Sequence, residues 1–211
     1  DMVLIIEALD SSFGDLFWQF IEDGGYRHRN KSNDEFQFYR FSDPKDPEFP
    51  AMIELFSRKP NHINLPFDTR LTPIHIDESV VSLSAILLND VYYDSLIKSK
   101  RTVKGFSVIE IETLILFKIK AWLDLIKRQE TGERVDSRNI RKHRNDIFRL
   151  LASVVPSSKV ETASEILDDI NEFITLIEQD KPDLKSLGFH TMTLNDFLAL
   201  LKSVFLEPSS S

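Results

Sequence analysis

The strongest constraint on the fold is a pattern of apolar residues between positions 111 and 151 that predicts two helices joined by a polar turn. Gly132 interrupts the pattern, and Asp136 or Ser137 is suited to cap the second helix. The apolar residues recur at the three- and four-residue spacing of a helix that buries one face. They are Ile111, Leu114, Ile115, Trp122, Leu125 and Ile126 in the first helix, and Ile140, Ile147, Leu151 and Val154 in the second.

Each of these helices carries a cation where the spacing calls for a buried residue. Lys118 lies on the apolar face of the first helix, and Arg144 lies on that of the second, flanked by His143 and Asp146. Burying a cation without a partner costs several kcal/mol. Each cation therefore forms an ion pair between helices, extends its charged end to water, or faces a polar cleft and an anionic ligand. For one cation alone we favour the structural explanations, but two in consecutive helices favour a functional site.

The composition limits the classes of protein to consider. The chain has 211 residues, a net charge of −8, no cysteine, and no apolar run long enough to cross a bilayer. The lack of thiols excludes disulfides and thiolate metal sites and is typical of a cytoplasmic protein, and we expect no membrane association. The acidic balance argues against general coating of nucleic acid. A local basic surface stays open, because residues 138–149 include five Arg or Lys and one Asp.

The order of the predicted elements indicates an α+β fold with a sheet-containing first half and a helical second half. We expect strands at 2–6, 36–41, 51–57 and 105–109, the first covered on both faces and the next two forming a hairpin. Segment 80–88 fits either a strand or a helix. Further helices are expected at 13–21 and 90–98, after a cap at Ser157 or Ser158, and after the capping pair Thr193 and Asp196. The predicted domains are therefore 1–109 and 110–211.

Two carboxylates lie at strand positions where they could share a divalent cation. Asp1 precedes the first strand, and Glu54 interrupts the apolar alternation of a later one. Magnesium takes hard oxygen ligands and commonly uses one or two carboxylates together with phosphate oxygens. The structural alternatives are an exposed chain end for Asp1 and, for Glu54, an edge-strand position paired with Arg58.

Several short motifs occur in the order seen in one enzyme family. They are Asp1-Met2-Val3-Leu4, Ile53-Glu54-Leu55, Leu116-Phe117-Lys118-Ile119-Lys120-Ala121, then Arg128, and Lys142-His143-Arg144-Asn145-Asp146-Ile147-Phe148. The first two resemble the aspartate-bearing strand and the third carboxylate of the polymerase-β-like nucleotidyltransferases. The others resemble the helical signature of the AbiEii-type abortive-infection toxins. The resemblance extends to about residue 151, and its specificity comes from the order of the motifs.

The resemblance implies transfer of a nucleotide from a nucleoside triphosphate to an acceptor, for which tRNA, protein and small molecules all stay open. By position in the motifs, Lys118 would be catalytic and would contact the triphosphate. Asp146 would be the acidic catalytic residue of the last motif, with Arg144 and His143 contacting phosphate beside it. The toxin family also implies an antitoxin as a candidate partner.

The same resemblance assigns magnesium to Asp1 and Glu54, with one departure from the family pattern. The Gly-Ser phosphate-binding turn and the first Asp of the Asp-x-Asp pair are absent from the sequence. If Asp1 is the second member of that pair, both features lie upstream, which agrees with a chain that starts without methionine at a strand. We therefore expect an N-terminally truncated nucleotidyltransferase-like domain that folds but is inactive, because its metal site is incomplete.

Two alternatives come from other functional classes. The segment Arg138-Asn139-Ile140-Arg141-Lys142-His143 has the Arg-Asn-x-x-x-His form of HEPN-type ribonucleases, in which a histidine acts as acid or base near neutral pH. The other alternative is a module that binds nucleotide or a protein partner without catalysis. Substitution separates the first two classes, because nucleotidyl transfer is expected to need Glu54 and ribonuclease activity to need His143.

Overall fold

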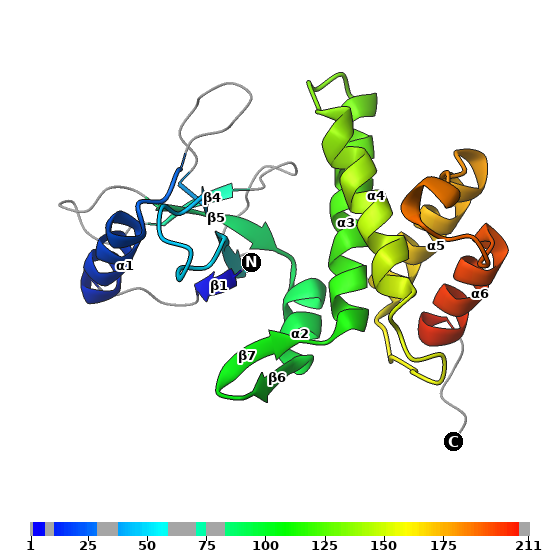
Figure 1. Cartoon of the computed structure of the whole chain (residues 1–211), viewed down its shortest axis with the longest axis horizontal. Coiled ribbons are helices and arrows are strands. Elements are labelled where there is room, and N and C mark those ends of the chain that lie inside the picture. The colour runs from blue at the N-terminus through cyan, green and yellow to red at the C-terminus, as the bar shows by residue number, and fades with distance from the viewer. Residues whose placement is uncertain (1, 7–10, 29–37, 59–70, 75–82, 207–211) are drawn as a thin grey trace. The chain divides into compact units, whose positions relative to one another are not determined.

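The computed structural model describes residues 2–6, 11–28, 38–58, 71–74 and 83–206. The chain divides into two compact units, Asp1–Asp90 and Val91–Ser211 (Figure 1). Strands are concentrated in the first unit and helices in the second, which confirms the α+β class predicted from the sequence. The division falls earlier than the expected boundary at residue 109, because the helix and β-hairpin that precede that residue group with the helical unit.

A mixed sheet forms the centre of the first unit. Its strands are β1 (Met2–Ile6), β2 (Arg40–Ser42), β3 (Met52–Arg58), β4 (Leu71–Ile74) and β5 (Leu83–Leu88). The strand order is β1-β3-β5-β4, and β2 pairs with the first part of β3. Strands β1, β3 and β5 run parallel, whereas β2 and β4 run antiparallel to their neighbours. The β2–β3 pairing confirms the predicted hairpin, although residues 36–37 lie outside the described residues, and segment 80–88 contains a strand.

Strand β3 and helix α1 (Ser11–Gly24) supply much of the core of the first unit. Ile53 and Leu55 are fully buried, whereas the alternate residues of β3 are partly exposed, as the two-residue period of a strand requires. They pack in one cluster with Phe17, Ile21, Tyr26 and Phe41, and Trp18 packs against that cluster. Burying each large apolar side chain contributes about 1.5–3 kcal/mol to folding. The helix ends at paired glycines, and Gly25 adopts a φ of 61° that suits glycine.

The prediction that β1 is covered on both faces is wrong. Met2 and Leu4 pack against the core of the first unit, but Val3 points to the opposite face and is 46% exposed. A continuous apolar run of five residues is equally compatible with a strand that is covered on one face. The sequence pattern alone therefore could not distinguish the two arrangements.

The second unit is helical apart from one β-hairpin. Its elements are α2 (Asp90–Lys98), β6 (Lys100–Val103), β7 (Phe106–Ile109), α3 (Ile111–Glu130), α4 (Ser137–Leu151), α5 (Ser164–Gln179), a 3₁₀ turn at Lys185–Leu187, and α6 (Leu194–Phe205). Helices α3 and α4 form the predicted helical hairpin and lie side by side (Figure 1). Within the described part of the chain, no helix combines the length and the apolar character needed to span a membrane.

Side chains from α3, α4, α5 and α6 build the core of the second unit. Trp122 of α3 packs edge-on against Phe173 of α5, and Phe148 of α4 packs edge-on against Phe197 of α6. The same core contains Ile115, Leu116, Ile119, Leu123, Ile147, Leu151, Ile170 and Leu201. The predicted stripe of α4 faces this core. In α3 the buried face is shifted: it includes Leu116, Ile119 and Leu123, whereas Leu114 and Leu125, which were predicted for it, are half-buried and lie outside the core cluster.

The ends of these helices were predicted with mixed success. Asp136 caps α4 by accepting a hydrogen bond from the backbone N–H of Arg138, and Thr193 with Asp196 forms a capping box at α6. The prediction that Ser157 or Ser158 begins α5 is wrong, because that helix starts at Ser164. The preceding segment instead approaches α6, where the N–H of Val160 donates to the carbonyl oxygen of Val204 over 2.9 Å.

Candidate functional site in the helical unit

Lys118 and Asp146 form an ion pair that links α3 to α4. The Lys118 Nζ donates to Asp146 Oδ2 over 3.1 Å, and the two side chains are 25% and 22% exposed. Arg149 lies one turn along α4, with its Nη1 3.5 Å from the other carboxylate oxygen of Asp146. The contact between helices explains how a lysine is accommodated within an apolar stripe. It is one of the structural alternatives left open by the sequence, and it brings together two of the predicted site residues.

Arg144 makes a second connection, from α4 to the end of α5. Its Nη1 donates to Asp180 Oδ2 over 2.9 Å, and its side chain is only 16% exposed, whereas Asp180 is 83% exposed. The Nε of Arg144 is buried and has no hydrogen-bond partner among the described residues. A buried guanidinium donor without an acceptor is costly. Arg144 therefore has one unsatisfied donor, which is shielded from solvent and could reach a ligand oxygen only after its neighbours move.

His143 lies beside Arg144 on α4 and is half-buried, with its Nδ1 shielded from solvent. Arg138, its partner in the ribonuclease-like motif, is bound to Asp136 by side-chain hydrogen bonds, the shortest of 2.8 Å. These and the backbone hydrogen bond from Arg138 lower the pKa of Asp136. Five residues correspond to about 140° around an α-helix. The helix therefore does not place Arg138 and His143 on one face.

The sequence reasoning missed a buried polar group at the junction of α2, α3 and α5. The Tyr92 hydroxyl and the Lys120 Nζ both donate to Asp169 Oδ2, each over 2.8 Å. Asp169 is 7% exposed and Tyr92 is 2% exposed, whereas the Lys120 side chain is 42% exposed, so the carboxylate and the tyrosine are buried and the lysine reaches solvent. Burial and then the neighbouring Asp169 charge raise the pKa of Tyr92 well above its usual range. The available signal was the position of Asp169 within the apolar stripe of α5, three residues after Ile166.

Glu54 lies in the first unit and is held by an arginine on the neighbouring strand. Arg40 is directly opposite Glu54 in the β2–β3 pairing, and its Nη2 and Nε lie 2.6 and 2.7 Å from Glu54 Oε1. The Glu54 side chain is 16% exposed. The structural alternative for Glu54 was a position on an edge strand and an ion pair with Arg58, and both parts of it are wrong. Strand β3 has neighbours on both sides, and Arg58 instead pairs with Asp90 over 2.7 Å.

The described residues do not by themselves assemble a metal site. They contain no group of three or more His, Asp or Glu side chains placed to hold an ion. Glu54 is one hard oxygen ligand of the kind that magnesium prefers, but Arg40 already binds one of its oxygens. Asp1, the second predicted ligand, lies outside the described residues. The magnesium site therefore stays a prediction.

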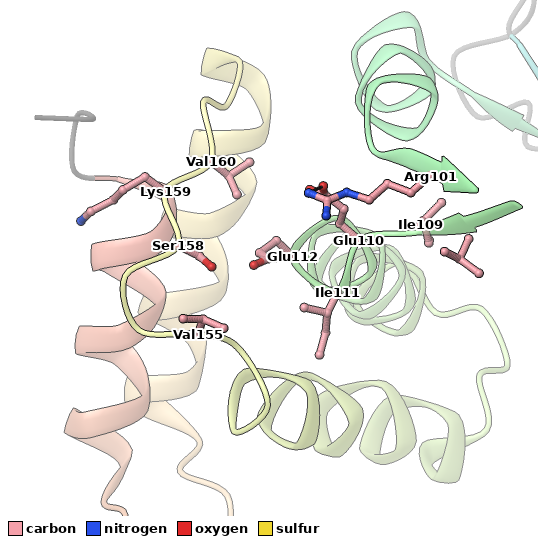
Figure 2. A pocket seen from close by; sticks show the side chains of 10 residues that line it. Arg101, Ile109, Glu110, Ile111, Glu112, Val155, Ser158, Lys159 and Val160 are labelled. Atoms are coloured by element: carbon pink, nitrogen blue, oxygen red, sulfur yellow. Dashed lines mark ion pairs between the residues drawn. The ribbon is translucent and has the colours of Figure 1, made fainter. Parts of the chain in front are cut away.

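A shallow pocket of about 450 Å³ lies elsewhere in the helical unit and contains none of the predicted site residues (Figure 2). Its walls are the β6–β7 hairpin, the start of α3, and the segment before α5. Arg101 forms an ion pair with Glu110 at its rim, and Lys159 points away and donates to the carbonyl oxygen of Ser203. Two carboxylates, those of Glu110 and Glu112, remain in the lining. This mixture of charges does not favour a phosphate-bearing ligand.

The structure thus joins Lys118 to Asp146, places Arg144 and His143 on the same helix, and leaves Glu54 in the other unit. The chain matches no protein-family model, no curated protein and no solved structure. Any statement about function therefore depends on the residues themselves and on the order of their motifs.

Proposed function

We propose that this protein is a nucleotidyltransferase-like enzyme that transfers a nucleotide from a nucleoside triphosphate to an acceptor, with magnesium. The observation that carries the proposal is Glu54, a largely buried carboxylate on an interior strand of a mixed sheet, fixed by Arg40 on the adjacent strand. A glutamate at such a position is costly to bury, and the ion pair with Arg40 offsets that cost and fixes the orientation of the carboxylate. The sequence motifs that follow it in the helical half support the same reading.

The roles proposed for the helical residues follow from their charges. Lys118 and Arg144 supply positive charge to the phosphates of the triphosphate, and His143 contacts phosphate beside Arg144. Each of these two cations is bound to a carboxylate, Asp146 or Asp180. A triphosphate carries more charge than one carboxylate and can replace it. Asp180 is the more readily displaced partner, because it is 83% exposed and its contact with Arg144 is weakened by solvent.

Asp146 is the acidic residue of the last motif and keeps Lys118 in place between α3 and α4. Magnesium, held by Glu54 and Asp1, would neutralise charge on the phosphates when it is bound. Nucleotidyl transfer depends on positioning and charge neutralisation more than on covalent catalysis by side chains. A set composed of carboxylates and cations, without a required nucleophile, therefore suits this reaction class.

The experiment compares matched substitutions in the full-length gene product. Glu54→Gln keeps the shape of the side chain and removes its charge, and Glu48→Gln makes the same change at an exposed position of the same unit. With magnesium, each labelled triphosphate and cellular RNA or protein as acceptor, we expect label transfer by the parent and by Glu48→Gln. Loss of about a hundredfold or more is expected for Glu54→Gln. Equal transfer by the two variants would contradict the proposal.

The same assay distinguishes the two alternatives. A HEPN-type ribonuclease would cleave RNA, lose cleavage in His143→Ala and transfer no label. A non-catalytic module would bind triphosphate, RNA or a partner such as an antitoxin without turnover of any substrate. Arg144→Ala tests triphosphate binding independently of any turnover. Loss of this cation should weaken triphosphate binding, and the difference in affinity between parent and variant should shrink as salt rises.

A further inference from the structure

The β6–β7 hairpin is the most exposed element of the helical unit. Lys104 and Gly105 form its two-residue loop with φ values of 51° and 84°, the conformation of the tight turns that join antiparallel strands. Each residue of the two strands is exposed except Ile109, which is half-buried. An isolated two-stranded hairpin is only marginally stable in water. This hairpin therefore gains stability if another chain covers it.

One face of the hairpin carries three apolar side chains and one arginine. The register pairs Val103 with Phe106 and Arg101 with Val108, so these four side chains share one face. Phe106 is 75% exposed, Val103 is 51% exposed and Val108 is 41% exposed. Large apolar side chains that are exposed together commonly mark an interaction surface.

The two edges of the hairpin differ in charge. Strand β6 carries Lys100 and Arg101, and Lys104 follows it, whereas residues 106–109 of β7 carry no charge. Lysine and arginine on an edge strand discourage pairing with another strand, and an uncharged edge permits it. In the described residues β7 pairs only with β6. The uncharged edge is therefore available for pairing.

The register also fixes which backbone groups face outward. Residues that flank a two-residue hairpin loop form a hydrogen-bonded pair, so the next pair, Thr102 and Ser107, directs its N–H and C=O groups away from the partner strand. By the same alternation Lys100 and Ile109 are the next outward residues on their strands. Strand β7 thus offers Ser107 and Ile109 as hydrogen-bonding positions at its free edge.

We propose that β7 pairs antiparallel with β7 of a second copy of this chain, around a twofold axis at Val108. Ser107 of one copy exchanges backbone hydrogen bonds with Ile109 of the other, and the reverse pair is identical by symmetry. The result is a four-stranded sheet across the dimer, with the cationic β6 strands at its outer edges. The apolar faces of the two hairpins become continuous, and Phe106 of each copy lies diagonal to Val108 of the other.

A second copy can pair at this edge because the edge carries no charge. In the β7 pairing Val108 faces its own symmetry mate, so no like charges are opposed. The equivalent pairing of two β6 strands would place Arg101 opposite Arg101 and is disfavoured. The symmetric arrangement therefore uses the one edge of the hairpin that tolerates self-pairing.

The first test is cysteine cross-linking, for which the chain is suited because it contains no cysteine. In the proposed dimer, Val108→Cys faces its mate as a non-hydrogen-bonded pair with Cα atoms about 4.5 Å apart, a separation that a disulfide can span. Val103→Cys is the matched control, since Val103 is exposed on the same face but lies on the outer strands, about 20 Å from its mate. Under one mild oxidant we expect disulfide-linked dimers from Val108→Cys at least about tenfold faster than from Val103→Cys. Equal rates would overturn the proposal.

The second test removes one outward N–H from each edge of the hairpin. Ser107→Pro deletes the donor on β7, and Thr102→Pro deletes the equivalent donor on β6, and neither change removes a bond within the hairpin. By sedimentation equilibrium we expect a weak dimer in the parent and in Thr102→Pro, and at least about tenfold weaker association in Ser107→Pro. Far-ultraviolet circular dichroism checks that the helices are retained. A parent that stays monomeric at all concentrations, or a dimer unaffected by Ser107→Pro, would overturn the proposal.

Discussion

Individual side chains explain why cations are tolerated in the apolar faces of α3 and α4. Lys118 and Arg144 each reach a carboxylate on another helix, and Lys120 reaches the buried Asp169. The sequence located Lys118, Arg144 and Asp146 correctly as unusual residues, because helical spacing identifies positions on a buried face. It could not identify the partners, since pairing between helices depends on how the helices cross.

The Lys118–Asp146 pair leads to a prediction about stability. Asp146→Ala leaves the Lys118 ammonium partly buried without its carboxylate, and we expect a loss of about 1 kcal/mol in the free energy of unfolding. Lys118→Met should cost less, because the methionine continues the apolar stripe of α3. Urea unfolding monitored by circular dichroism measures both. Asp168→Ala, at an exposed position of α5, is the control, and a cost as large as that of Asp146→Ala would argue against a specific pair.

Tyr92 leads to a prediction about alkaline pH. Its pKa in the folded chain is raised above the ordinary value of 10.0 by burial and by Asp169. Above pH 10 the unfolded chain therefore releases this proton while the folded chain retains it, and stability falls as pH rises. The slope from this group is about 1.4 kcal/mol per pH unit. Tyr92→Phe lacks it, so the stability difference between parent and variant should change with pH above 10 and stay constant between pH 7 and 9. A constant difference throughout would contradict the assignment.

Whole elements were predicted best where periodicity was long and the ends had recognisable caps. The helices α3, α4 and α6 appear where the sequence places them, with Asp136 and Thr193 as caps. Strand β6 was missed because Lys100, Arg101 and Thr102 are polar and show no alternation of burial. The start of α5 was missed because two serines after a proline resemble a cap, whereas the observed N-cap, Ala163, makes no side-chain hydrogen bond. Tertiary contacts, such as that between Val160 and Val204, decide such cases.

The two units of the molecule have separate apolar cores, which leads to a prediction about fragments. Every buried member of the larger core lies between Tyr92 and Phe205, and every member of the smaller core lies before residue 56. We expect residues 91–211 expressed alone to be helical and to unfold cooperatively in urea, since they retain their full core. A non-cooperative transition in this fragment would show that its core needs the first unit.

The division into two units also gives each half its own optical reporter. The chain contains two tryptophans, Trp18 in the first unit and Trp122 in the second. Trp18 packs against the core of the first unit, and Trp122 is buried in the core of the helical unit. The fluorescence of each tryptophan therefore changes when its own unit unfolds and exposes it to water. Fluorescence of a Trp18→Phe variant therefore reports the helical half alone, and that of a Trp122→Phe variant reports the sheet. Comparing the two signals shows whether the halves melt together or in sequence.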